Sequence, residues 1–408
     1  MSAYLAACEL EIIMSITSLK YIHYLLFFAI CAIGCFSNRK IIDELPCIDV
    51  RKTYPEKEIN ITDIANVSYI HLNTDDDEYL YKGRILCVTQ NTFVVYDQSS
   101  FSILFFSRNG VPKSRFNRFG QGPEEYWGAD RILFDEETDD VFICNTYSDI
   151  NYVQVYSSTG EYKRKITLPQ NAMMWSLVSF DNQSLFVFAE NFHYSRLTTI
   201  NRKSNIPYTT YYRISKSNGK ILDSLQLISN EVELTFQLKE GGGSWITNYY
   251  RFVKCVDGFF LCNPETDTVF HYTGGQSLTP VLHKIPLARN QDPKVVIPNI
   301  VDSRRYQFFE VQTLFAGIQS RLYFLDKETG EIFRQKLISH DFKGKEFNIC
   351  VSLCMTDTGD VNGYIFELGL YELKEAYKEN RLSGKLKELV ATLNEDEDNN
   401  VFMMVEFM

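Results

Sequence analysis

Three pairs of residues combine the side-chain types that bind sugars and anions. The pairs are Trp127 with Arg131, Trp245 with Arg251, and Arg304 with Arg305. Aromatic rings suit sugar faces, whereas guanidinium groups bind carboxylates and phosphates through a planar fork of donors. If these residues meet at the mouth of a channel, we predict that a glycan or an acidic ligand binds there. The alternative is that the Trp side chains pack in the interior and the Arg side chains are surface charges.

The sequence lacks the residue patterns that are typical of an active site. It has no G-x-S-x-G motif, and its six histidines are scattered singly, whereas zinc ligands usually come in closely spaced pairs. We therefore predict no catalytic residue, no metal and no cofactor. The alternative is a hydrolase or lyase that acts on a carbohydrate or a lactone in the central channel. Carboxylate pairs for such chemistry are recognised by their separation in space, which a sequence does not give.

Charge argues against nucleic acid as a partner. The chain has 52 acidic and 41 basic residues, and no basic cluster is long enough to follow a phosphate backbone. Acidic runs occur at residues 75–78, 135–140 and 395–398, next to turn-forming residues. We interpret these runs as solvated loop tips, with a cation site as the alternative.

The start of the chain carries the pattern of an export signal. Lys20 precedes the apolar run LLFFAICAI at residues 25–33, which is far shorter than the roughly 20 residues of a membrane-spanning helix. The run ends in Gly34 and Cys35, and this ending resembles the lipobox of bacterial lipoproteins. The resemblance implies cleavage before Cys35 and a lipid on its thiol; a plain secretion signal is the alternative. Met14 is the more natural start, because acidic residues precede it.

The number and spacing of the remaining cysteines do not indicate a disulfide framework. Of the ten cysteines, Cys8 and Cys31 lie in the signal region and Cys35 is the lipid site, which leaves an odd seven. Their spacing gives no paired pattern, so we interpret most of them as small core residues.

A recurring unit of short strands indicates the fold. Each unit has a short apolar strand, a polar turn, an alternating strand, and a hairpin that contains glycine. The hairpin glycines are Gly110, Gly160, Gly219, Gly274 and Gly330, at spacings of 50, 59, 55 and 56 residues. Each is expected to adopt a positive φ. One four-stranded unit cannot bury both faces alone, so the units are predicted to stack around an axis as the blades of a β-propeller.

Five units and the flanking segments predict six blades. Residues 371–393 have helical periodicity, and the final VFMMVEF is a strand. If that strand or the one near Ile48 completes a blade from the other end of the chain, the ring is closed and has no open edge.

The turn RFGQGPEEY at residues 118–126 resembles the R-x-G-x-G-P-G-E-Y turn of a known family. That family is the six-bladed β-propeller lipoproteins of Gram-negative gut-type bacteria, similar in architecture to NHL-repeat propellers. Glu124 stands where the family usually has Gly. The resemblance implies an all-β, six-bladed propeller with a short helical segment near the C-terminus. The residues that carry this structural motif are Gly120, Gly122, Pro123, Glu125 and Tyr126.

Together these observations predict three segments: a signal peptide at 1–34, a lipid-anchored linker at 35–46, and a single six-bladed propeller at 47–408. The residues after Cys35 are not acidic, so we expect an outer-membrane lipoprotein that faces the periplasm rather than the cell surface. We predict a monomeric, non-catalytic binding or scaffold protein for a glycan or an envelope protein.

Overall fold

The computed structural model divides the chain into two compact units, Met1–Glu44 and Leu45–Met408. The structure describes residues 45–408 except 75–77, 130, 146–151, 171, 174–175, 191–207, 229–234, 238–243, 247–251, 256, 264–265, 288–293, 298–299, 315–317, 350–362 and 396. The predicted signal peptide and Cys35 lie outside the described residues. Within the described part of the chain, no helix is long and apolar enough to span a bilayer.

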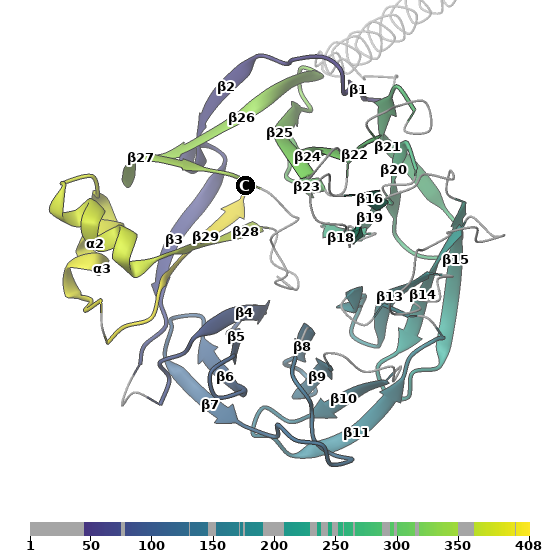
Figure 1. The fold of residues 1–408 in the computed structure, drawn as a ribbon, viewed down its shortest axis with the longest axis vertical. Coiled ribbons are helices and arrows are strands. Elements are labelled where there is room, and N and C mark those ends of the chain that lie inside the picture. The colour runs from purple at the N-terminus through teal and green to yellow at the C-terminus, as the bar shows by residue number, and fades with distance from the viewer. Residues whose placement is uncertain are drawn as a thin grey trace, which may run out of the picture. The chain divides into compact units, whose positions relative to one another are not determined.

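Three consecutive sheets are four-stranded antiparallel meanders. In each, the first strand lies on the inside of a ring and the last strand on its outside (Figure 1). The first sheet comprises β4 (Gly83–Val88), β5 (Thr92–Asp97), β6 (Ser102–Ser107) and β7 (Pro112–Phe116). The second comprises β8 (Arg131–Asp135), β9 (Asp140–Cys144), β10 (Tyr152–Tyr156) and β11 (Tyr162–Thr167). The third comprises β12 (Val178–Ser179), β13 (Ser184–Glu190), β14 (Tyr208–Ser215) and β15 (Ile221–Ile228).

Burial explains why inner and outer strands differ in sequence. All six residues of β5 are buried, because neighbouring sheets cover both of its faces. In the outer strand β7, exposed and half-buried residues alternate, as expected for a strand with one face in water. The core between the first two sheets joins Phe105 of β6 to Ile132 of β8. The sheets therefore stabilise one another face to face, as blades do.

Two further sheets are larger because N-terminal strands join their outer edges. One contains β18 (Phe252–Cys255), β19 (Gly258–Leu261), β20 (Thr268–Tyr272) and β21 (Leu278–Ile285), with β1 (Cys47–Asp49) parallel to β21. The other contains β22 (Lys294–Val296), β23 (Ile300–Asp302), β24 (Tyr306–Leu314), β25 (Ile318–Asp326), β26 (Glu331–Ser339) and β27 (Phe342–Phe347), with β2 (Glu56–Asn60) parallel to β26. A separate hairpin pairs β16 (Thr235–Gln237) with β17 (Ser244–Ile246). The added strands cover edges that would otherwise be open.

The last sheet joins the two ends of the described chain. The 3-10 helix η1 (Ile61–Asp63) leads into β3 (Ala65–His71), which pairs antiparallel with β29 (Val401–Phe407), and β29 pairs with β28 (Gly363–Leu368). The final strand therefore pairs with a strand from the other end of the described chain, as predicted. The segment near Ile48 instead pairs with β21.

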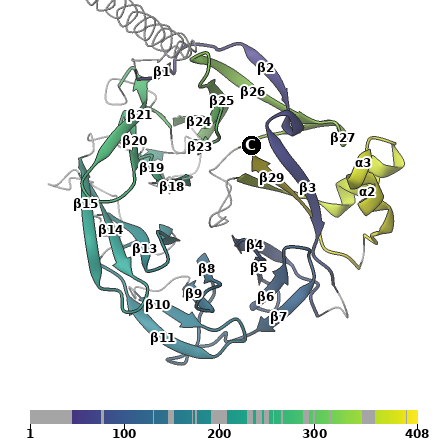
Figure 2. The same ribbon diagram turned by 180° about the vertical axis from the view of Figure 1, so that it is seen from behind.

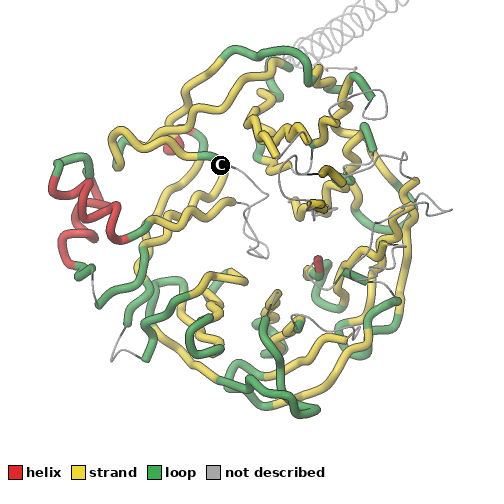
Figure 3. The backbone as a smooth tube through the Cα atoms, in the orientation of Figure 1, coloured by secondary structure: helices red, strands yellow, loops and turns green. Residues whose placement is uncertain are grey.

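Two helices lie between β28 and β29 in the chain: α2 (Leu370–Lys378) and α3 (Gly384–Thr392). They stand to one side of the ring beside β3 (Figures 2 and 3). The buried faces carry Leu373 and Ala376 of α2 and Leu386 and Val390 of α3, and these side chains enter the core of the last sheet. The predicted helical segment is therefore present, as two helices.

The hairpin glycines have the predicted backbone conformation, with φ between +74° and +118° at all five positions. Gly110 also meets a steric limit, because a Cβ there would lie 1.8 Å from the carbonyl oxygen of His71 on β3. A glycine is required at this position both by its φ and by the close approach of the last sheet.

The fold is an all-β propeller, but the predicted count of six blades is not confirmed. Five sheets have four strands or more, and the sheet β28-β29-β3 has three among the described residues. Residues 350–362, which belong to the predicted sixth blade, lie outside the described part of the chain.

Candidate functional site

A cavity of about 440 Å³ opens where four consecutive sheets meet at the ends of their innermost strands. We call it the mouth pocket. Its polar lining comes from the turns after β4, β8 and β12, from the turn after β14, and from the end of β18. The residues used below are Asn91, Asp135, Glu136, Glu137, Asn182, Lys216 and Lys254.

Three consecutive carboxylates at the end of β8 dominate the pocket, and each is held by a neighbouring sheet. Lys216 donates to Asp135 over 2.6 Å from the turn after β14. Thr92 and Asn91 of the first sheet donate to Glu136 over 2.5 and 3.0 Å. Asn182 of the third sheet donates to Glu137 over 3.2 Å. Because the partners come from two sides, the carboxylates are fixed before any ligand arrives.

The central carboxylate, Glu136, is ionised at neutral pH. Burial raises its pKa, but hydrogen bonds from Thr92, Thr89 and Asn91 outweigh burial and place the pKa below its ordinary value. An ionised carboxylate with a low pKa accepts hydrogen bonds well and is a poor general acid.

The floor of the pocket is apolar, and its rim carries amides and a cation. Leu133, Phe142 and Leu185 are buried beneath it, while Lys254 reaches it from the end of β18. Hydrogen-bonding groups above an apolar floor suit a ligand that carries hydroxyl groups on a less polar ring face.

Of the six sequence-predicted ligand contacts, the four whose side chains the structure describes do not line the mouth pocket. Arg131 begins β8, whereas Asp135 ends it, so Arg131 lies at the opposite end of the blade from the mouth pocket. Arg131 is buried, and its Nε donates to the carbonyl of Leu177 over 3.1 Å. Trp127 precedes β8 and is exposed, with its backbone N–H bound to Asn145. Arg131 thus contacts the segment before β12 of the third sheet, whereas Trp127 contacts the residue that follows β9 of its own sheet.

Arg304 and Arg305, the third predicted pair, are also absent from the lining of the mouth pocket. Arg304 and Arg305 follow β23, and both are exposed. Arg305 forms ion pairs with Asp326 at 3.0 Å and Glu328 at 3.4 Å. Trp245 lies in β17, outside the part of the chain whose side chains are described, and Arg251 is not among the described residues.

The predicted structural motif forms a tight turn between the first and second sheets. Tyr126 is fully buried between them, and its hydroxyl donates to the carbonyl of Phe101 over 2.6 Å. The N–H of Gly122 donates to Glu125 over 2.8 Å, and a Cβ on Gly120 would lie 1.9 Å from the same carboxylate. Pro123 and Glu124 complete the turn, and the carbonyl of Glu124 accepts from Tyr156 over 2.9 Å.

One group of described residues has the donor set of a metal site. Cys255, Asp257 and His271 each offer a ligand atom, and these atoms lie within 4.8 Å of one another. Cys255 is not in a disulfide, and burial raises the pKa of its thiol to about 12. This group lies on the sheet that also supplies Lys254.

Sequence reasoning missed both the mouth pocket and this cysteine-containing group. By its composition the run 135–140 indicates a solvated loop tip, although it begins at the end of the innermost strand of a predicted blade. The place of the run at the end of an innermost strand is a sequence signal for a binding site, because the ends of innermost strands converge in a propeller. Cys255 and His271 are 16 residues apart, and only the pairing of both their strands with β19 brings them together.

Comparison with known proteins supports the fold. A family model described as a domain of unknown function, DUF4934, matches residues 45–406. A crystal structure of a Bacteroides fragilis protein, whose name suggests export, aligns over 90% of this chain and 100% of its own, with 16% identity and a TM-score of 0.57. The acylaminoacyl peptidase of Pyrococcus horikoshii aligns over 69% of this chain and 48% of its own, with 9% identity and a TM-score of 0.37. No curated protein matches the sequence, and the predicted NHL-like relationship is not confirmed.

Proposed function

We propose that this chain, which belongs to the DUF4934 family, is an envelope-anchored lipoprotein. Its propeller binds a glycan and does not catalyse a reaction. The single observation that carries the binding role is the row of carboxylates Asp135, Glu136 and Glu137 in the mouth pocket, each held by a neighbouring sheet. A protein ligand is the other partner that the sequence allows.

The chemistry of the pocket favours a glycan. Carboxylates and amides accept and donate hydrogen bonds with the vicinal hydroxyls of a sugar, and the apolar floor suits the C–H face of its ring. Lys216 balances the charge of Asp135, whereas Glu136 is bound by neutral donors and keeps its negative charge and acceptor capacity for a ligand.

Glu136 favours binding over hydrolysis. Glycosidases need a carboxylic acid that keeps its proton near neutral pH, and such acids have a raised pKa. The pKa of Glu136 lies below its ordinary value, so this residue does not supply that proton.

The location rests on the sequence. The apolar run before Gly34 and Cys35 supports export and a lipid anchor, with the periplasmic face favoured. Export is also what the name of the Bacteroides fragilis neighbour suggests for that protein. We propose a monomer with residues 1–34 removed, 35–46 as the linker, and 47–408 as one propeller.

We also propose that β28-β29-β3 is a sixth blade. The support is a contact that recurs around the ring between an outer strand and the hairpin glycine of the following blade. A Cβ on Gly160 would meet Phe116 of β7, and one on Gly219 would meet Thr167 of β11. In the same way, a Cβ on Gly110 would meet His71 of β3. β3 thus packs as the outermost strand of a blade that precedes the first one.

A panel of immobilised envelope oligosaccharides tests the binding role, with the full mature chain, Glu136→Gln and the control Glu161→Gln. Glu161 is an exposed carboxylate on the β10–β11 turn of the same sheet, remote from the pocket lining. We expect the wild type and Glu161→Gln to bind the same oligosaccharide, and Glu136→Gln to bind it about tenfold more weakly, because one good hydrogen bond is lost. Equal binding by all three proteins would exclude the mouth pocket. Release of reducing ends from a bound oligosaccharide would overturn the non-catalytic assignment.

A further inference from the structure

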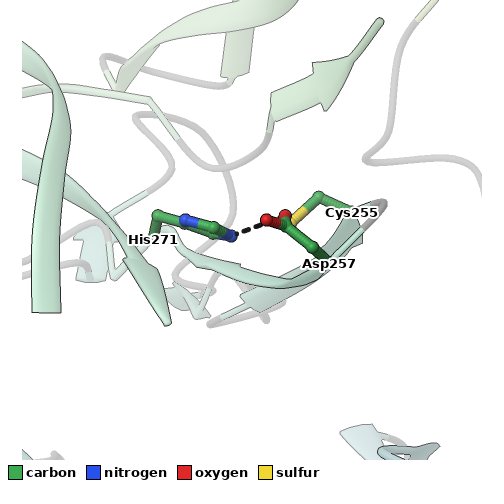
Figure 4. A group of neighbouring side chains, drawn as sticks. All are labelled: Cys255, Asp257 and His271. Carbon is green, nitrogen blue, oxygen red and sulfur yellow. Dashed lines mark ion pairs between the residues drawn. The ribbon is translucent and has the colours of Figure 1, made fainter. Parts of the chain in front are cut away.

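Three potential metal ligands lie close together at the β18–β19 turn, beside the innermost strand of their blade. They are Cys255, Asp257 and His271. The Nε2 atom of His271 lies 3.0 Å from Oδ1 of Asp257, and the Cys255 sulfur is within 4.8 Å of both ligand atoms. In Figure 4 the His271 side chain points toward Asp257 and Cys255, which lie together on the opposite side of the group. Asp257 is largely exposed, whereas Cys255 and His271 are partly buried.

Strand register fixes this arrangement. Cys255 pairs with Gly258 across the tight turn that carries Asp257, and His271 pairs with Phe260 on the adjacent strand. A Cβ on Gly258 would lie 2.3 Å from the carbonyl oxygen of Tyr272, the residue that follows His271. The turn is therefore packed directly against the end of β20, and the distance between the three side chains is set by backbone contacts.

The histidine is incompletely satisfied by the protein. Its Nε2 atom is buried and makes no hydrogen bond of good geometry, although Asp257 is close to it. A buried imidazole nitrogen that makes no well-formed hydrogen bond is costly, and a metal ion between Nε2 and the Asp257 carboxylate would satisfy it. The neighbouring Cys255 is not in a disulfide, and a coordinated metal ion would displace the proton of its thiol.

One further carboxylate and its lysine partner interact with the group. Asp302, at the end of β23, interacts electrostatically with both Cys255 and His271. Lys327 holds Asp302 over 2.9 Å. Carboxylates just outside the ligands orient histidine and raise its basicity in known metal sites.

We infer that Cys255, Asp257 and His271 form a binding site for Zn²⁺. Thiolate, imidazole and carboxylate are the three side-chain ligands that this ion takes, and Ca²⁺ or Mg²⁺ would not select the sulfur. Three protein ligands leave a fourth tetrahedral position, which the exposed side of Asp257 opens to water or to a ligand oxygen. The site is separate from the mouth pocket and does not depend on glycan binding.

Metal titration of the reduced, chelator-stripped full chain tests the site. The probes are Zn²⁺, followed by native mass spectrometry, and Co²⁺, whose bond to a thiolate gives a charge-transfer absorption in the near ultraviolet. The variants are Cys255→Ser, His271→Gln and Asp302→Asn. The controls are Cys47→Ser, which removes an exposed thiol, and His283→Gln, which removes an imidazole on β21 of the same sheet.

We expect one Zn²⁺ per chain in the wild type and in both controls, and a Co²⁺–thiolate band that Cys255→Ser abolishes. His271→Gln should weaken binding by about 100-fold, and Asp302→Asn by about tenfold. Circular dichroism of the metal-free variants checks that each is folded. The absence of one-to-one binding in the wild type would overturn the inference, as would unchanged binding by folded Cys255→Ser and His271→Gln.

Discussion

Lys216 and Asp135 join two neighbouring blades through a buried ion pair. The Lys216 Nζ atom donates to Asp135 Oδ2 over 2.6 Å, and each side chain is 10% exposed. Asp135 is also the first of the three carboxylates in the mouth pocket, so this pair links the stability of the ring to the shape of the site.

Replacement of Lys216 by Met should destabilise the protein. The change leaves Asp135 without its cation in a mostly buried position, and breaking such a pair costs about 3 kcal/mol of the free energy of unfolding. Urea denaturation measures this loss. The double variant Lys216→Met, Asp135→Asn should recover most of it, because no charge is then stranded. A double variant that is less stable than Lys216→Met would contradict this account.

Gly110→Ala should weaken the closure of the ring. The alanine would adopt a φ of +82° and place its Cβ 1.8 Å from the carbonyl oxygen of His71. Gly344→Ala is the matched control, because Gly344 has a φ of +81° and nothing within 4 Å of the added Cβ. We expect the control to cost about 1 kcal/mol and Gly110→Ala to cost at least about 2 kcal/mol more, measured by thermal or urea unfolding. Equal losses would show that the contact with His71 is not limiting.

Acid should release the stabilisation that Asp326 provides. Burial raises the pKa of this carboxyl, but the Arg305 hydrogen bond, the Glu328 backbone N–H and the charges of Arg305 and Lys57 outweigh it, so the folded pKa lies below 3.8. A lowered pKa stabilises the folded state above the unfolded pKa, and this contribution disappears as pH falls through the folded value.

The corresponding measurement compares the wild type with Asp326→Asn in urea from about pH 6 to about pH 2. The wild type should be more stable at the upper end of this range, and the difference should shrink below about pH 4. Glu331→Gln, an exposed carboxylate on β26, is the control and should leave the profile unchanged. A difference that stays constant with pH would refute the assignment.

Cys35 should carry the membrane anchor. In Gram-negative cells the mature chain is expected to begin at Cys35, to gain the mass of a lipid and to partition into detergent. Cys35→Ala should abolish all three properties, whereas Cys47→Ser should leave them unchanged. A soluble wild-type chain of unmodified mass would exclude the lipid anchor and leave the propeller fold intact.

The sequence determined the local elements of this protein because their signals are local. The hairpin glycines, the alternating strands and the apolar face of residues 371–393 each depend on neighbours a few residues away. They predicted an all-β propeller, the positive φ of Gly110 and a helical segment near the C-terminus, which the structure shows.

Only the tertiary structure decided which of these elements meet. The pairing of β1 with β21 and of β2 with β26 joins residues more than 200 positions apart, and no local pattern encodes such a register. The same holds for the sites: the acidic run at 135–137 becomes a pocket only when the ends of neighbouring innermost strands converge on it. His271 reaches Cys255 only through the pairing of β19 with β20. Inter-blade packing and strand register are long-range properties, and they determine the positions of the side chains that could bind a ligand.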